Sequence, residues 1–385
     1  MIMECAAPTP ARAQDFEIVA RPHGGNQWLA RADAYSVARA FVNGEIEVQG
    51  DIIAAVRFQL SRSGSAWQRQ FLDAVCRWNP WRLTQRWSSR ESTARHIRFH
   101  YDRSNDFYQL FLDTRMVYSC AYFNPPEASL DQAQAAKLDH ICRKLHLEPG
   151  NRFLDIGCGW GALATEAALR WGVRASGCTL SRRQFEYASQ RIRAASLERH
   201  VSIHEMDYRD VAGEFDKISS VGMFEQVGRA QLGDYFRRVY ALLAPEGLFL
   251  NHGITRPAPV HSDAQSLFIA RKVFPGGQIV NLHEVIRSAE HAGFEVLDVE
   301  NLRRHYAHTC RAWVDRLTAH RERCLETVDA STWRTWRLYL AGSAVAFEAG
   351  SLGLHQVLMA KRGANSAAPA TRDYMYGSRQ AKRDK

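Results

Sequence analysis

The stretch "RFLDIGCGWGALATEAALRWG", residues 152–172, decides the fold of this chain. Its first residues form an apolar run that predicts a buried strand, and "GALATEAALRWG" predicts a helix. Gly157, Gly159 and Gly161 lie at the junction of the two elements. Glycines at a tight strand-to-helix turn bring the backbone close to a ligand, as in the nucleotide sites of parallel α/β sheets. The stretch therefore predicts a sheet and also the edge of that sheet where a ligand binds.

The spacing of these glycines separates two classes of cofactor. A dinucleotide site has the spacing G-x-G-x-x-G and an acid about 20 residues further on. This chain has G-x-G-x-G, and its next strand ends in "CTLS" without an acid. The acid lies before the glycines instead, at Asp155. A carboxylate there suits S-adenosylmethionine, whose sulfonium and amino groups are positive, and the alternative is a tight turn without a ligand.

Strand and helix signals alternate from about residue 96 to 362, which indicates a mostly parallel α/β sheet with helices on both faces. One helix is expected at 182–195. A second is expected at 231–247, where Pro245 and Gly247 end it. Strands are expected at 152–157, 173–180, 201–207, 215–222 and 248–254, with a late pair at the sheet edge, 294–302 and 355–362.

Three further regions surround this domain. Residues 1–75 predict a small α+β module, with a helix that ends near Asn43, a short strand or turn, and a second helix. Residues 76–95 form a basic aromatic linker in which arginines alternate with tryptophans. Such a pattern suits a membrane headgroup interface, single-stranded nucleic acid or a packed linker. The small, polar and basic tail, 363–385, is expected to be disordered.

The bulk composition bounds the class of protein. The chain has 385 residues, 46% hydrophobic and 24% charged, which is typical of a soluble globular protein. No apolar run approaches the length of a membrane-spanning helix, and the N-terminus does not resemble a secretory signal. The eight cysteines have no disulfide or zinc spacing, so we expect reduced thiols, no metal and a cytoplasmic location. The formal charge of +9 favours a polyanionic partner.

A carboxylate follows one of the predicted buried strands. Residues 221–228 read "VGMFEQVG", so Glu225 lies in an apolar run bracketed by glycines. A solvated loop charge or an acid at a helix N-terminus would be a structural explanation. A catalytic or ligand-orienting group would be a functional one, because ligands bind beyond the carboxyl ends of the strands.

Several motifs together give a family resemblance. The chain resembles the cyclopropane-fatty-acyl-phospholipid synthases and the related mycolic acid cyclopropane synthases and methyltransferases over about residues 96–362. That resemblance implies a Rossmann-like class I methyltransferase fold with a seven-stranded sheet. The small N-terminal module resembles the family's lipid-associated domain only loosely. The motifs are "HYD-x-x-ND" at 100–106, "YSCAYF" at 118–123, "LDIGCGWG" at 154–161, "TLS-x-x-Q" at 179–184, "VGMFE-x-VG" at 221–228, and "HY" at 305–306 before Trp313.

The resemblance implies a set of contacts to S-adenosylmethionine. Asp207 and Tyr208 are expected beside the adenine. Thr179 and Gln184 offer neutral donors and acceptors to the ribose, where a dehydrogenase would use an acid. The remaining expected contacts are Tyr118, Ser119, Asp155, Gly157, Gly159 and Leu180.

The resemblance also implies a reaction. The methyl group is transferred to the double bond of an unsaturated phospholipid acyl chain, and ring closure to a cyclopropane requires the loss of one proton. A bound bicarbonate is expected to take that proton, held by Cys120, Glu225, His252, the Ile254 backbone and Tyr306. The aromatic side chains Tyr122, Phe123, Phe274 and Tyr306 would stabilise a carbocation or simply pack in the core. Glu225 would then be a functional carboxylate.

Three departures from the family keep alternatives open. Gln226 follows Glu225 where well-known members have His, "HGI" at 252–254 replaces "HTI", and Ser343 replaces a frequent Cys. A C-methyltransferase that makes a methyl- or methylene-branched chain is therefore the second hypothesis. A non-catalytic lipid-surface protein is the third. A nucleic-acid methyltransferase is disfavoured, because "MFEQ" replaces an Asn-Pro-Pro-aromatic motif. The expected partners are phospholipid acyl chains and the anionic inner leaflet of the cell membrane, not nucleic acid, and a homodimer stays open.

Overall fold

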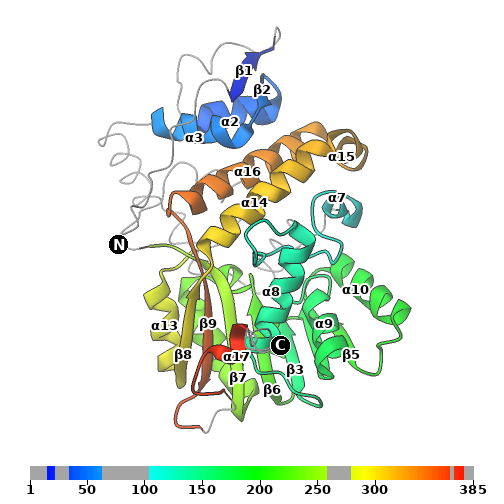
Figure 1. Ribbon diagram of the computed structural model, residues 1–385, viewed down its shortest axis with the longest axis vertical. Coiled ribbons are helices and arrows are strands. Elements are labelled where there is room, and N and C mark those ends of the chain that lie inside the picture. Colours follow the sequence, from blue (N-terminus) through cyan, green and yellow to red (C-terminus); the bar gives the residue numbers. More distant parts are fainter. Residues whose placement is uncertain (1–14, 22–33, 63–103, 258–278, 365–367, 377–385) are drawn as a thin grey trace, which may run out of the picture.

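The computed structural model describes residues 15–21, 34–62, 104–257, 279–364 and 368–376. Its described elements form three tiers along the long axis (Figure 1). The small N-terminal module lies at one end, a helical cap follows it, and a sheet covered by helices forms the other end. The predicted linker, residues 76–95, and Phe274 lie outside the described residues.

The sheet has seven strands in the order β5-β4-β3-β6-β7-β9-β8. Strand β9 runs antiparallel to both of its neighbours, and the other described pairings in this sheet are parallel. The expected mostly parallel, Rossmann-like α/β fold is therefore confirmed. The strands are β3 (Arg152–Ile156), β4 (Arg174–Thr179), β5 (Val201–Glu205), β6 (Phe215–Val221), β7 (Leu243–Thr255), β8 (Phe294–Asn301) and β9 (Gly353–Lys361).

Helices cover both faces of the sheet because both faces of its strands are apolar. On β7, Leu248 and Leu250 point to one core, and Phe249 between them points to the other. Burial of a side chain of this size stabilises the fold by about 1.5–3 kcal/mol. The first face carries α8 (Leu130–Lys144), α9 (Ala162–Trp171) and α10 (Arg182–Ala194), and the second carries α11 (Leu232–Leu242) and α13 (Leu282–His291).

A helical cap is inserted between β8 and β9. It consists of α14 (Arg303–Ala319), α15 (Arg321–Thr327) and α16 (Ala330–Glu348), and the short helix α7 (Asn105–Gln109) packs beside it. Trp313 and Trp336 are fully buried within it. The cap lies over the sheet on the side of the N-terminal module (Figure 1).

The N-terminal module packs on the cap. Strands β1 (Phe16–Ala20) and β2 (Ile46–Gly50) form an antiparallel pair, and helices α2 (Ala34–Asn43) and α3 (Ile52–Arg62) contact α16. The predicted helix end at Asn43 is confirmed. Gly44, with φ of 77°, turns the chain there.

Two expectations about element boundaries were wrong. The helix predicted to reach 247 ends at Leu242, and β7 already begins at Leu243. The reason is that Leu243 pairs with Phe215, after which the register shifts around the proline. The tail is also not disordered throughout, because Asp373–Tyr376 forms helix α17 against α8. Met375 is 4% exposed, and Arg372 forms an ion pair with Asp298 at 2.7 Å. The polar composition of the tail did not indicate either interaction.

The described residues also bear on the expectations from composition. None of their helices combines the length and the apolar character needed to cross a bilayer. The six cysteines within the described ranges are free thiols. The described ranges contain no cluster of three or more His, Cys, Asp or Glu side chains suited to hold a metal ion.

Candidate active site

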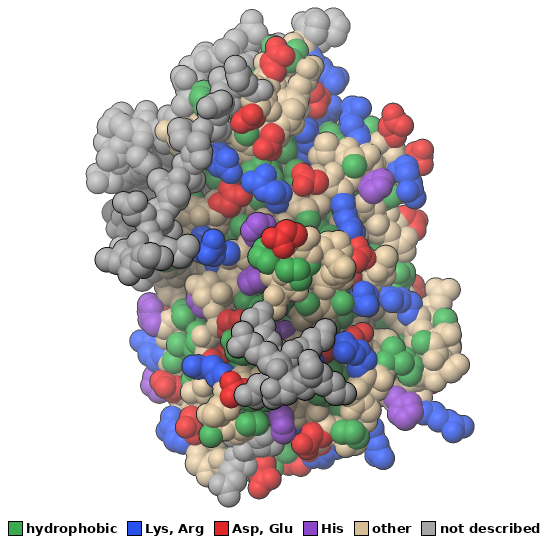
Figure 2. Space-filling view, viewed as in Figure 1, with side chains coloured by type: hydrophobic (Ala, Val, Ile, Leu, Met, Phe, Trp, Pro, Cys, Tyr) green, Lys and Arg blue, Asp and Glu red, His purple; other side chains and the backbone are tan. Residues whose placement is uncertain are grey.

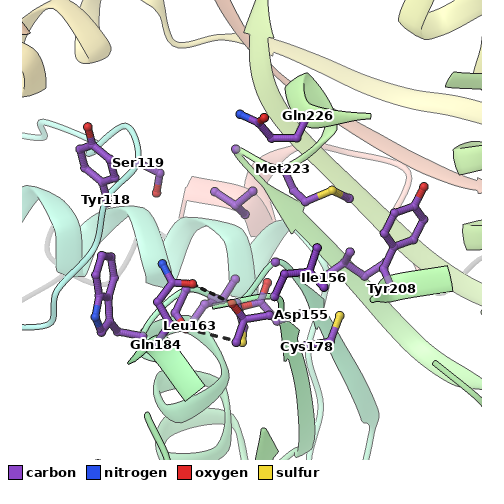
Figure 3. A pocket seen from close by; sticks show the side chains of 18 of the residues that line it. Tyr118, Ser119, Asp155, Ile156, Leu163, Cys178, Gln184, Tyr208, Met223 and Gln226 are labelled. Carbon is purple, nitrogen blue, oxygen red and sulfur yellow. Dashed lines mark hydrogen bonds between the residues drawn. The ribbon is translucent and has the colours of Figure 1, made fainter. Parts of the chain in front are cut away.

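A pocket opens at the carboxyl ends of β3, β4 and β6, which is where the glycine turn predicts a ligand. Figure 3 shows Tyr118 and Ser119 on one side of it, Tyr208 on the other, and Asp155 between them. Every residue predicted to touch the cofactor lines this pocket. These residues are Tyr118, Ser119, Asp155, Gly157, Gly159, Thr179, Leu180, Gln184, Asp207 and Tyr208.

The glycine turn has a backbone that side chains rarely permit. Gly157, Gly159 and Gly161 have φ values of 75°, 54° and 80°. A Cβ atom built on Gly159 would meet no atom within 4 Å, so the backbone there faces open space. A ligand can approach this peptide directly, and a larger residue would both strain the turn and occupy that space.

Two polar pairs lie where the sequence predicts the ribose and the adenine of the cofactor. Thr179 Oγ1 donates to Gln184 Oε1 at 2.7 Å, which fixes the orientation of the Gln184 amide. Asp207 accepts a hydrogen bond from Arg209 Nε at 2.8 Å and starts the short 3₁₀ turn Tyr208–Asp210. The negative charge of Asp207 is thus balanced within the protein.

Asp155 places a carboxyl group on the wall of the pocket. It is 3% exposed, and Ser219 Oγ donates to its Oδ1 at 2.7 Å. Burial raises the pKa of Asp155 to about 6. A positive ligand group beside it would favour the ionised form, which agrees with the ammonium and sulfonium of S-adenosylmethionine.

Glu225 lies beside this pocket, in the 3₁₀ turn Phe224–Gln226 that follows β6. It is buried, and its Oε1 accepts a hydrogen bond from the Ile254 N–H at 2.7 Å. Its Oε2 has no hydrogen-bond partner among the described residues. Burial raises the pKa of Glu225 to about 7. The sequence predicted that the Ile254 N–H donates to a bound anion. In the structure it donates to Glu225 instead.

His252 lies on β7, two residues before Ile254. It is 1% exposed, and its Nδ1 lies 3.1 Å from Gln356 Nε2 on β9. Its Nε2 makes no hydrogen bond within the described part of the chain. Burial lowers the pKa of His252 well below 6.5, so the ring is neutral. With Gln356 donating to Nδ1, the proton of the neutral ring is on Nε2.

Cys120 and Tyr306 belong to the same apolar core, against which Ile254 also packs. The thiol of Cys120 is fully buried and lies 3.8 Å from the Leu302 carbonyl, which also accepts the backbone N–H of Tyr306. Burial raises the pKa of Tyr306, and the charges of Cys120 and Glu225 raise it further. Cys120, Ile254 and Tyr306 therefore share one core, Glu225 accepts a hydrogen bond from the Ile254 backbone, and His252 lies on the same strand as Ile254. None of the five lines the cofactor pocket itself.

The departures from the family pattern fall in different places. Gln226 lines the cofactor pocket, next to Glu225 in sequence (Figure 3). A Cβ atom on Gly253 would lie 1.9 Å from the Phe224 ring and 3.1 Å from Glu225 Oε1. The glycine of "HGI" therefore lets the turn that carries Glu225 approach β7. Ser343 is buried in the cap helix α16.

Sequence reasoning missed Lys137 and Gln356. Lys137, on α8, lines the pocket, and Gln356 on β9 contacts His252 on the adjacent strand β7. A lysine among the apolar residues of "AQAAKLDHI" was a weak signal for the first. Gln356 gave no signal, because its importance depends on the strand beside it.

Comparisons with known proteins identify a family and several named relatives. The family model described as mycolic acid cyclopropane synthetase matches residues 88–357. A protein of Pseudomonas putida named probable fatty acid methyltransferase is 43% identical over 90% of this chain and 88% of its own length. The cyclopropane mycolic acid synthase MmaA2 of Mycobacterium tuberculosis is 33% identical over 69% of this chain and 96% of its own length.

Two solved structures extend the likeness to three dimensions. The cyclopropane synthase MmaA2 from Mycobacterium tuberculosis has a TM-score of 0.68 and 32% identity over 70% of this chain and 98% of its own. The mycolic acid cyclopropane synthase CmaA1, complexed with SAH and CTAB, has a TM-score of 0.67 and 32% identity over the same shares of the two chains. The chain therefore belongs to the mycolic acid cyclopropane synthetase family and is an S-adenosylmethionine-dependent methyltransferase.

Proposed function

We propose that this enzyme methylates the double bond of an unsaturated fatty acyl chain of a phospholipid and closes a cyclopropane ring, with bound bicarbonate as the base. The observation that carries the proposal is the pair of buried polar atoms without partners among the described residues, Glu225 Oε2 and His252 Nε2. A buried polar atom without a hydrogen-bond partner destabilises the fold unless a bound ligand supplies that partner. The names of the relatives, which specify fatty acid and mycolic acid chains, support the substrate class.

The two atoms suit a bicarbonate ion. Glu225 Oε2 would accept a hydrogen bond from its hydroxyl group, and His252 Nε2–H would donate to one of its oxygens. This arrangement requires an ionised Glu225 and a neutral His252. The pKa of about 7 for Glu225 permits the first near neutral pH, and the lowered pKa of His252 ensures the second.

When bound, S-adenosylmethionine supplies an electrophilic methyl group to the weakly nucleophilic alkene. The residues of the chain must then keep water from a cationic carbon and stabilise it with aromatic faces. We assign this role to Tyr306, which packs against the buried core that contains Cys120, with its ring centroid 4.6 Å from that of Phe347. We do not assign it to Tyr122, because its ring is stacked between His140 and His305 at 4.5 and 4.7 Å.

Methylation without ring closure is the second candidate. Gln226 lines the cofactor pocket where well-known family members have His, and the Pseudomonas putida relative is named a fatty acid methyltransferase. An enzyme whose base removes a proton without closing the ring would release a methylene-branched product, and a methyl branch would then require reduction by a further enzyme. Cyclopropane and methylene products each add one CH₂, so mass alone does not separate the two.

The test is expression in a host rich in monounsaturated phospholipids, followed by proton NMR of the extracted lipids. Upfield cyclopropyl signals are expected, and they should be absent with Glu225→Gln. Olefinic methylene or methyl-branch signals would favour the second candidate. Unchanged lipids from a folded enzyme would refute both. The matched control is Gly159→Trp, which fills the open space at the glycine turn and removes every product.

A further inference from the structure

The cofactor pocket has an uneven distribution of charge. Among the described residues that line it, Lys137 and Arg209 are the basic side chains. Arg209 is bound to Asp207 through both Nε and the terminal nitrogen, on the side expected to hold adenine. Lys137 lies at the opposite end, where Nζ donates to Ser119 Oγ at 2.9 Å. The pocket therefore has a balanced cation at one end and Lys137 at the other.

Lys137 is buried without an ion pair. It is 2% exposed, and among the described residues no carboxylate lies within the 4 Å of a salt bridge. Burial lowers the pKa of Lys137 to about 8, and the charges of Asp113 and Asp155 oppose this shift in part. The oxygens of Asp113 accept backbone N–H groups of Val117 and Arg115 instead. Burial of an ammonium group without a partner costs several kcal/mol, so this position calls for an anion from outside the chain.

Lys144 shows what the same helix does when the partner is internal. It lies on α8, two turns after Lys137, and is fully buried. Its Nζ contacts Glu300 at 2.6 Å and Asp298 at 3.0 Å. The two lysines lie on the same helix and both are buried. Within the described residues, Lys144 has paired carboxylates and Lys137 has none.

We infer that Lys137 binds the α-carboxylate of S-adenosylmethionine. The methionine end of that cofactor is a zwitterion, with an α-ammonium and an α-carboxylate on the same carbon. Asp155 and Lys137 provide the opposite pair of charges in the lining of the same pocket, close enough to interact electrostatically. The Ser119 hydroxyl, already held by Lys137, is a second donor or acceptor beside them. This assignment rests on the use of S-adenosylmethionine and not on the acyl substrate or product proposed above, so the two can fail separately.

The first measurement uses the unmodified enzyme and two ligands. Calorimetry compares S-adenosylhomocysteine with its decarboxylated analogue, S-adenosyl-3-thiopropylamine, which differs by the carboxylate alone. We expect the carboxylate to improve affinity roughly ten- to a hundred-fold, the range of a hydrogen bond between charged groups. Equal affinity for the two ligands would overturn the assignment whatever the variants show.

The second measurement assigns this preference to Lys137. Lys137→Met should weaken S-adenosylhomocysteine binding roughly ten- to a hundred-fold and leave the analogue within about two-fold of its parent value. Lys144→Met is the matched control and should preserve the preference for the carboxylate. If Lys137→Met weakens both ligands equally, or retains the preference, the lysine has a structural role and the assignment is wrong. Lys137→Gln repeats the test if the methionine variant does not fold.

Discussion

We expect kcat/KM to depend on pH through the ionisation of Glu225. Its buried carboxyl group has a pKa raised to about 7, and the proposed anion site requires the ionised form. Below pH 7 kcat/KM should therefore fall about ten-fold per pH unit, and above pH 7 it should reach a plateau. The measurement is a pH profile from 5.5 to 8 at saturating S-adenosylmethionine with buffered bicarbonate. A flat profile across this range would contradict the role of Glu225.

The same residue should cost the enzyme stability. In the unfolded chain the pKa of Glu225 is near 4.5, so above pH 7 folding buries a charged carboxylate at a cost of about 3 kcal/mol. Glu225→Gln removes this charge. The variant should gain up to about 3 kcal/mol in free energy of unfolding at pH 8, and the gain should fade as the pH falls from 7 to 4.5.

Chemical denaturation at pH 8 and pH 5 measures this effect of Glu225 on the free energy of unfolding. Glu214→Gln is the control, because Glu214 is about half exposed and its surface ion pair with Arg152 contributes little. That control should change the free energy of unfolding by less than about 1 kcal/mol at either pH. A less stable Glu225→Gln protein at pH 8 would mean that the charged carboxylate stabilises the fold beyond its hydrogen bond from the Ile254 N–H.

At the scale of elements, the C-terminal segment 368–376 belongs to the domain. Its carbonyl at Met375 lies 3.1 Å from His140 Nδ1, and Arg372 binds Asp298, so it closes a buried cluster of charges between α8 and β8. Met375→Ala should lower the free energy of unfolding by about 2 kcal/mol or more, because the methionine is buried in the core. Tyr376→Ala, on the same short helix but 55% exposed, should have a much smaller effect. Equal and negligible effects would show that the segment does not dock in solution.

The elements differ in how far local sequence predicts them. Strand β3 was predictable because its residues are mainly apolar and a glycine turn follows it, and β4 and β6 were predictable because strand and helix signals alternate along this part of the chain. The helical cap was not predictable, because helix α16 is buried on nearly all sides. Its sequence, which includes buried tryptophans, therefore lacks the usual alternation of an apolar and a polar face. The first residues of β7 and the tail were misjudged, since both depend on partners distant in sequence. Only the fold reveals such partners.

The candidate site divides in the same way. Asp155, near the end of β3, and Glu225, just after β6, could be predicted as residues near a ligand because parallel strands end at one edge of the sheet. Their joint placement beside one pocket agrees with that reasoning. Lys137 and Gln356 were missed because each acts on a residue of another element, Ser119 and His252. A single sequence does not show which elements are adjacent.

At the scale of the molecule, we propose that the enzyme works on an anionic membrane surface. Figure 2 shows acidic and basic side chains interspersed over one face of the described residues, so this face has no dominant basic patch. The basic aromatic segment, 76–95, lies outside them and contributes to the net charge of +9. The acyl double bond lies on the order of 10 Å or more below the headgroups, so an enzyme acting on it must hold its substrate entrance at the surface.

Liposome sedimentation tests this proposal. Replacement of Arg82, Arg86, Arg90 and Arg95 by glutamine should weaken binding to anionic vesicles, since each charge near the surface contributes about 1 kcal/mol. Added salt should weaken the parent in the same way. A folded variant that sediments like the parent would place the membrane contact elsewhere in the chain.

The position of β9 has a consequence for how the protein is made. This strand lies between β7 and β8, yet it follows both of them and the whole cap in the sequence. A ribosome therefore releases β7 with an unpaired edge and β8 without any partner until Gly353–Lys361 has emerged. Exposed edges of this kind recruit other chains, and pairing over such long separations is slow. Nascent chains that stall after α16 should depend most on chaperones, because the last strand to be synthesised is the one that joins β8 to the rest of the sheet.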